Sequence, residues 1–82
     1  MGNQQFKQQI HDLDVTVRVG KGGLDAVISE VDNQLADRDL VKVKFLRSAR
    51  GGTDAEELAA ELAEEVGAEV VDVRGHTAVV HS

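Results

Sequence analysis

The stretch VTVRVGKGGL, residues 15–24, carries the signals from which the fold can be worked out. Its valines alternate with polar residues, which predicts a strand with one buried face. The glycine-rich run 20–23 ends that strand, because glycine favours turns and weakens strand pairing. From Leu24 onward apolar residues recur at helical spacing, so we expect a helix that runs to about Asp37.

A strand and a helix follow in the same order further along the chain. Residues 40–46 alternate apolar and basic side chains, which predicts a second strand. Thr53, followed three residues later by Glu56, is a capping-box signal for the start of a helix. Apolar residues at helical spacing continue to Val66, and Gly67 stands where a left-handed residue ends a helix.

The two ends of the chain complete the predicted order. Residues 3–11 are typical of a short polar helix, and residues 69–73 and 77–80 of strands that a tight turn pairs antiparallel. Elsewhere the alternation of strands and helices favours parallel neighbours. We therefore predict one α/β domain over residues 1–82, ordered helix–strand–helix–strand–helix–strand–strand, with a four-stranded mixed sheet.

The strand alternation also predicts which side chains share a face of the sheet. Those expected to face the helices are Val15, Val17, Val19, Val41, Val43 and Phe45. Those expected on the opposite face are Thr16, Arg18, Lys42 and Lys44. Since the acidic residues fall on the outer sides of the helices, the molecule should be basic on one side and acidic on the other.

The composition argues against several classes of protein. The chain has no cysteine, which rules out a disulfide scaffold and Cys-based metal sites. Its three histidines lack suitably spaced partner ligands, so no metal or cofactor is expected. No serine has an evident histidine partner, so we expect no catalytic residues and no enzyme. No apolar run approaches a membrane span. We expect a monomeric cytoplasmic protein that does not contact a membrane.

The net charge of −6 is distributed unevenly along the chain. Residues 38–50 carry five basic residues against one acidic residue, whereas residues 54–69 carry seven acidic residues and no basic one. The acidic run by itself is typical of a solvated helix face. Because the basic residues are concentrated in one segment, nucleic acid is still a candidate partner despite the overall negative charge.

The run Gly20-Lys21-Gly22-Gly23 lies between a strand and a helix, where free backbone N–H groups and the helix dipole favour an anion. It is too short for a P-loop, and Asp25 stands where a dinucleotide fingerprint needs its third glycine. It does match the G-x-x-G loop with which KH-type domains clamp a nucleic-acid backbone.

Four motifs occur in order: VGKGGL at 19–24, LVKVKF at 40–45, VGA at 66–68 and VRGHT at 73–77. Together they resemble the CRM domain (chloroplast RNA splicing and ribosome maturation), in particular the stand-alone YhbY-type proteins of prokaryotes. The resemblance implies a fold similar to the C-terminal domain of translation initiation factor three. It also implies binding of RNA, with association to ribosomal RNA in precursors of the large ribosomal subunit.

Ten residues are predicted to contact RNA: Gly20, Lys21, Gly22, Gly23, Arg18, Lys42, Lys44, Arg47, Arg50 and Arg74. The loop and the two strand lysines are carried over from the resemblance, and the arginines come from the charge pattern. Because no aromatic stacking platform accompanies them, we expect readout of backbone and shape more than of bases.

Other interpretations of the acidic charge stay open. The acidic helix of residues 53–66 could contact a basic ribosomal protein, which would make the domain a protein-interaction module with little RNA contact. A third interpretation is a fold that is retained with no RNA contact. Abundant Asp and Glu with few Lys also keeps a protein hydrated in concentrated salt, which suggests a halophilic archaeal source. In that case salt would screen the repulsion between acidic side chains and RNA.

Overall fold

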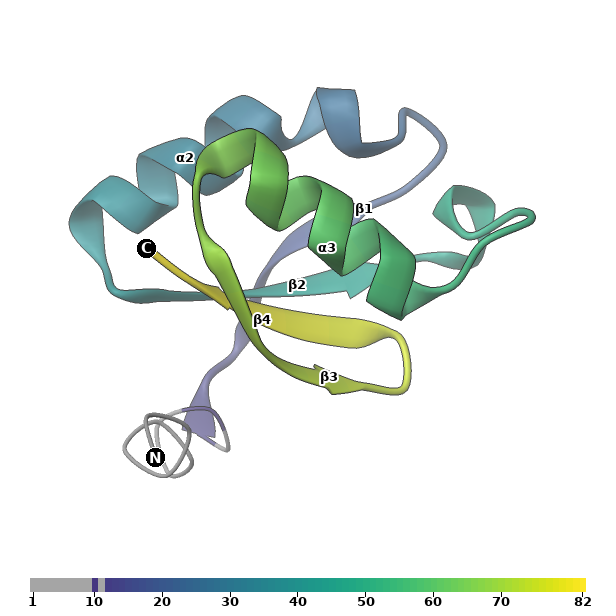
Figure 1. The fold of residues 1–82 in the computed structure, drawn as a ribbon. Coiled ribbons are helices and arrows are strands. Elements are labelled where there is room, and N and C mark those ends of the chain that lie inside the picture. Colours follow the sequence, from purple (N-terminus) through teal and green to yellow (C-terminus); the bar gives the residue numbers. More distant parts are fainter. Residues whose placement is uncertain (1–9, 11) are drawn as a thin grey trace.

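The computed structural model describes residue 10 and residues 12–82, and it forms two layers (Figure 1). Its elements are β1 (Val15–Val19), η1 (Leu24–Ala26), α2 (Ile28–Asp37), β2 (Leu40–Phe45), η2 (Arg47–Ala49), α3 (Ala55–Val66), β3 (Glu69–Arg74) and β4 (Thr77–His81). The two α-helices lie on the same face of the sheet. The helix predicted over residues 3–11 falls almost wholly outside the described residues. Within them, no helix is both long and apolar enough to cross a membrane.

The four strands form one mixed sheet in the order β1-β2-β4-β3. β1 and β2 are parallel, and β4 pairs antiparallel with both β2 and β3. The predicted α/β class with a four-stranded mixed sheet is therefore confirmed. The similarity to the C-terminal domain of initiation factor three stays a prediction.

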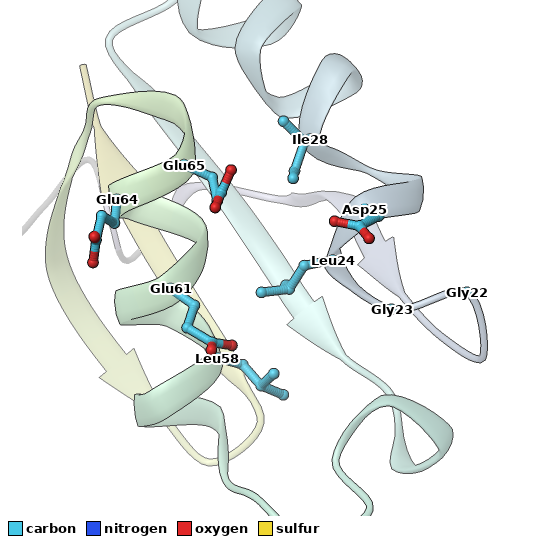
Figure 2. Close-up of a pocket in the computed structure, with 9 residues that line it drawn as sticks. All are labelled: Gly22, Gly23, Leu24, Asp25, Ile28, Leu58, Glu61, Glu64 and Glu65. Atoms are coloured by element: carbon cyan, nitrogen blue, oxygen red, sulfur yellow. The ribbon is translucent and has the colours of Figure 1, made fainter.

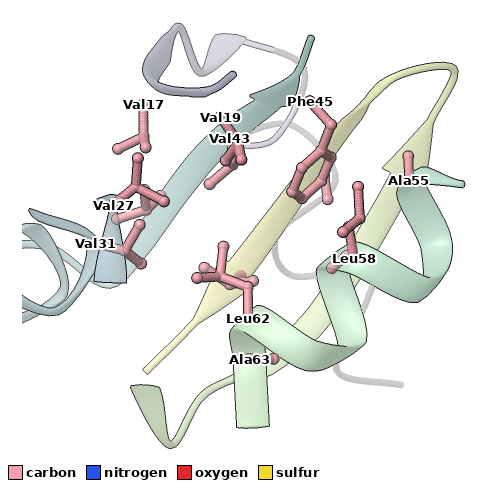
Figure 3. Packing of buried hydrophobic residues seen from close by; sticks show 14 of the residues in the cluster. Val17, Val19, Val27, Val31, Val43, Phe45, Ala55, Leu58, Leu62 and Ala63 are labelled. Carbon is pink, nitrogen blue, oxygen red and sulfur yellow. The ribbon is translucent and has the colours of Figure 1, made fainter. Parts of the chain in front are cut away.

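The hydrophobic core lies between the sheet and the two helices (Figure 3). Val19, Val43 and Phe45 of the sheet and Leu62 of α3 are completely buried. Burying each such side chain contributes about 1.5–3 kcal/mol relative to leaving it in water. The valine-rich strands and the leucine–alanine stripe of α3 therefore hold the layers together, and Phe45 is the one aromatic residue of this core among the described residues.

The second predicted helix begins later than expected. Residues 24–26 form the 3-10 turn η1, and α2 starts only at Ile28, after Val27 with a φ of −119° and a ψ of −4°. Gly23, which precedes η1, has a φ of 73° and supplies no capping side chain. The glycine-rich loop thus precedes the 3-10 turn η1 and not α2 directly, and the contribution of the helix dipole to the loop stays a prediction.

The face assignment of β1 is wrong at its first two residues. A register irregularity between Val15 and Val17 pairs Val15 with Lys42 and Val17 with Val43. Val15 therefore shares with Lys42 the sheet face opposite α2 and α3, while the Thr16 hydroxyl donates to Gln34 Oε1 of α2. A bulge adds one residue to one strand, so side chains before it change faces.

The predicted capping box of the third helix is shifted by one residue. Asp54, not Thr53, caps α3, and its carboxylate accepts a hydrogen bond of 2.9 Å from the backbone N–H of Glu57. Gly67 ends the helix with a φ of 67°, as expected. The bonds from Gly67 N to Glu64 O and from Ala68 N to Ala63 O satisfy the last carbonyls.

Candidate nucleic-acid interface

One row of residues across the sheet face opposite α2 and α3 carries three basic side chains. Arg18 of β1 lies opposite Lys44 of β2, Lys44 lies opposite Thr77 of β4, and Thr77 lies opposite Arg74 of β3. The residues next to them in the strands belong to the core or pack against it. Alternation therefore directs all four side chains of this row away from the helices.

The loops that follow this row lie at the same end of the sheet. Because β1 and β2 are parallel, the loops after both strands leave at one edge, and the β3–β4 turn joins them there (Figure 1). Leu46 N donates to Val19 O at 2.8 Å, and Phe45 N donates to the carbonyl of His76 at 2.7 Å. A Cβ on Gly20 would lie 3.7 Å from Ser48 Oγ, so the glycine-rich loop contacts the η2 loop.

We call this region the basic end of the sheet. Its basic residues are Arg18, Lys21, Lys44, Arg47, Arg50 and Arg74. Lys42 lies one row further from the loops, opposite Val15 and Val79, and is half-buried. The predicted residues are thus brought to one end of the sheet, where the strand residues share one face, with Lys42 at the margin.

The glycine-rich loop is a tight turn that exposes its backbone. Gly23 N donates to Gly20 O at 2.9 Å, which closes the turn, and Lys21 and Gly22 are both exposed. Among the described residues, the N–H groups of Lys21 and Gly22 have no hydrogen-bond partner. Adjacent free N–H groups in such a turn are suited to binding an anion.

Two of the predicted arginines are partly engaged within the protein. The Arg50 Nε–H donates to the Phe45 carbonyl at 3.0 Å, which holds this half-buried side chain against the end of β2. Arg74 lies 3.7 Å from the Asp72 carboxylate, but its side chain is 72% exposed. Such an exposed ion pair is weak, so Arg74 is available to a phosphate.

The basic row carries an electrostatic cost in the free protein. Arg18 and Lys44 are exposed, lie directly opposite each other, and form no ion pair within the described residues. Like charges in directly opposed positions destabilise a sheet. A bound anion would remove that repulsion. A metal centre is not indicated among the described residues, which contain no group of three or more His, Asp or Glu side chains that could hold a metal ion.

Thr77 and His76 belong to this end of the sheet but were missed by sequence reasoning. His76 lies in the exposed turn after Arg74, and Thr77 sits in the basic row between Lys44 and Arg74. Neither residue is a lysine or an arginine, so neither was part of the basic pattern in the sequence. The motif VRGHT contains both residues, yet only the placement of β4 between β2 and β3 brings them beside Lys44.

Comparisons with known proteins indicate the family of the chain. The family model of the CRS1 / YhbY (CRM) domain matches residues 2–81. A probable RNA-binding protein of Methanocaldococcus jannaschii is 44% identical over 73 residues, which make up 89% of this chain and 54% of the relative. The chain therefore spans about half the length of that curated relative.

A solved structure shares the fold. The solution structure of a hypothetical protein from Staphylococcus aureus, described as a candidate RNA-binding protein, matches with a TM-score of 0.77 and 30% identity. The match covers 96% of this chain and 81% of that one.

Proposed function

Because the chain belongs to the CRS1 / YhbY (CRM) domain family, we propose that it binds RNA through the basic end of the sheet. The observation that carries this proposal is the convergence of three separate segments. The glycine-rich loop, the η2 loop and the basic row come from different parts of the chain and meet at one edge. The names of its relatives point to the same class of partner.

The geometry supports a path for the RNA backbone. One phosphate would meet Lys21 and the free N–H groups of the glycine-rich loop, and the next ones would meet Arg47 and the row of Arg18 and Lys44. Bases would contribute little, because among the described residues Phe45 is the sole aromatic side chain and it is completely buried. Contacts of this kind recognise backbone and shape.

We propose ribosomal RNA of the large-subunit precursor as the biological ligand, on the strength of the family resemblance. Crosslinking of the protein to RNA in cells, followed by sequencing, is the experiment that identifies the ligand. We expect enrichment of large-subunit ribosomal RNA over messenger and transfer RNA. Enrichment of another RNA class would retain RNA binding and overturn the ribosomal assignment.

Charge-reversal variants test whether the basic end is the site. Lys21→Asp and Arg47→Asp should each weaken binding of a large-subunit RNA fragment by about tenfold, because each replaces a phosphate attraction by a repulsion. Arg38→Asp is the matched control, since Arg38 is exposed, precedes β2 at the opposite end of the sheet, and changes the net charge equally. Fluorescence anisotropy measures the affinities, and circular dichroism confirms the fold.

Gly22→Asp is a poor probe of this loop, although the position is central to it. A Cβ there would lie 3.0 Å from Ala26 Cβ, so a loss of binding could follow from a displaced loop. Gly51→Asp instead probes the neighbouring segment after η2 without a clash, because a Cβ at Gly51 meets no atom within 4 Å. Equal affinities of Lys21→Asp, Arg47→Asp and Arg38→Asp would remove the basic end from the site.

A second candidate function uses the other side of the molecule. The exposed carboxylates of α3 could contact a basic ribosomal protein, and the two functions are compatible because they occupy different surfaces. The exposure of Glu57, Glu61 and Glu64 along one helix favours this candidate.

A further inference from the structure

A groove with an apolar floor runs between the two helices on the face opposite the basic row. Its volume is about 450 Å³, and its walls are η1 with the start of α2 on one side and α3 on the other. Leu24, Ile28 and Leu58 supply the floor. Figure 2 shows Leu24 and Leu58 pointing into the space between the walls, with Glu61 and Glu65 on the α3 side.

The rim of this groove is entirely acidic. Asp25, Glu61, Glu64 and Glu65 line it and are exposed, and within the described part of the chain none of them forms an ion pair. Residues 22–37 and 51–73, which build both walls, contain no lysine or arginine. The chain therefore supplies no counter-charge for this rim from either helix.

These carboxylates do not stabilise the helix that carries them. Glu57, Glu61 and Glu65 follow each other at spacings of four residues on α3. Like charges four residues apart on a helix repel, at a cost of about 0.2–0.5 kcal/mol per pair. The last turn of α3 also has no basic residue, so Glu64 and Glu65 lie unfavourably at the negative end of the helix dipole.

We propose that this groove docks a lysine- and arginine-rich amphipathic segment of a partner protein. Aliphatic side chains of that segment would contact Leu24, Ile28 and Leu58, and its basic side chains would pair with Glu61, Glu64 and Glu65. Charge complementarity selects this occupant, because a nucleic acid would be repelled and a purely apolar segment would leave the carboxylates unpaired. Apolar anchors in a groove with a polar rim are a recurring mode of peptide recognition.

This docking groove rests on the second candidate function, for which it specifies the binding site and the kind of partner, and it does not depend on RNA binding. Gly22 and Gly23 line the groove on one side and belong to the glycine-rich loop on the other. A segment docked in the groove would therefore end beside the RNA surface. Its basic residues could extend the positive surface of the glycine-rich loop, which the acidic rim otherwise interrupts.

A synthetic peptide tests the groove directly. The probe has about 14 residues, with leucine at i, i+3, i+4 and i+7 and lysine or arginine between them. Titration into the isotope-labelled protein, followed by NMR, should shift the signals of Leu24, Ile28, Leu58 and Glu61. A permuted peptide of the same composition, with its leucines dispersed, should bind about tenfold more weakly, because only an ordered stripe fits the floor. Equal binding of both peptides would overturn the proposal.

Paired variants separate docking from general attraction of opposite charges. Glu61→Lys combined with Glu65→Lys should weaken peptide binding at least about tenfold. The control combines Asp32→Lys with Asp37→Lys, which makes the same charge change on α2 outside the groove. This control should weaken peptide binding at most about threefold. Equal losses in both pairs would overturn the proposal. RNA affinity measured on the same proteins distinguishes the two functions, because loss of peptide binding with RNA binding intact implicates the groove alone.

Discussion

At the residue scale, the start of α3 shows how one side chain satisfies a helix end. Asp54 accepts the Glu57 N–H at 2.9 Å, whereas Thr53 donates its hydroxyl only to the exposed Glu57 side chain. We therefore expect Asp54→Ala to lower the free energy of unfolding by about 1 kcal/mol, because a backbone donor loses its partner. Thr53→Ala should cost about 0.5 kcal/mol or less, since only an exposed side-chain bond is lost. Urea denaturation measures both, and a larger loss for Thr53→Ala would restore the capping box predicted from the sequence.

At the element scale, the pairing of β1 with β2 places two like charges side by side, which favours RNA binding and lowers the stability of the sheet. Arg18→Glu would place a carboxylate opposite Lys44 and turn a repulsive cross-strand pair into an attractive one. We expect thermal unfolding to shift slightly upward, by a stabilisation of about 0.2–1 kcal/mol, while RNA affinity falls. Neutralising the acids Glu57, Glu61 and Glu64 on α3 should change RNA affinity little. Unchanged affinity in Arg18→Glu would exclude the basic row from the RNA path.

At the scale of the whole molecule, the basic end and the acidic helix layer respond to salt in opposite ways. With about three to five phosphate contacts, log affinity should fall with log salt at a slope of roughly −2 to −3.5. Screening of the acidic helices opposes that loss, and hydrogen bonds from the free loop N–H groups persist at high salt, so we expect a shallow or non-monotonic dependence. Titration of RNA from low to molar KCl measures it.

The same salt series reports on folding. The crowded carboxylates between Glu56 and Glu65 repel each other, so the melting temperature should rise as KCl increases. A steep monotonic loss of RNA binding, with none detectable at molar salt, would contradict the interpretation of the acidic composition as adaptation to concentrated salt.

Much of the fold is readable in the sequence because its signals are local. Valine alternation marked β1 and β2, apolar spacing marked the stripe of α3, and Gly67 marked where that helix ends. Where two local signals competed, sequence reasoning failed. Thr53 and Asp54 both resemble capping residues, and the helical spacing that starts at Leu24 does not distinguish the 3-10 turn of residues 24–26 from the start of α2.

The sequence by itself determined the residue types of the candidate site: a glycine-rich turn, a run of basic residues, and acidic helices that contain no base. Only the tertiary structure decided which of them are neighbours. Placing β4 between β2 and β3 aligns Arg18, Lys44 and Arg74 in one row, and a bulge moves Thr16 to the helix side. Strand order and register arise from contacts between distant segments, which the pattern along any one segment does not contain. The groove between α2 and α3 has the same origin, because Leu24 and Leu58 become neighbours only when both helices pack on one sheet.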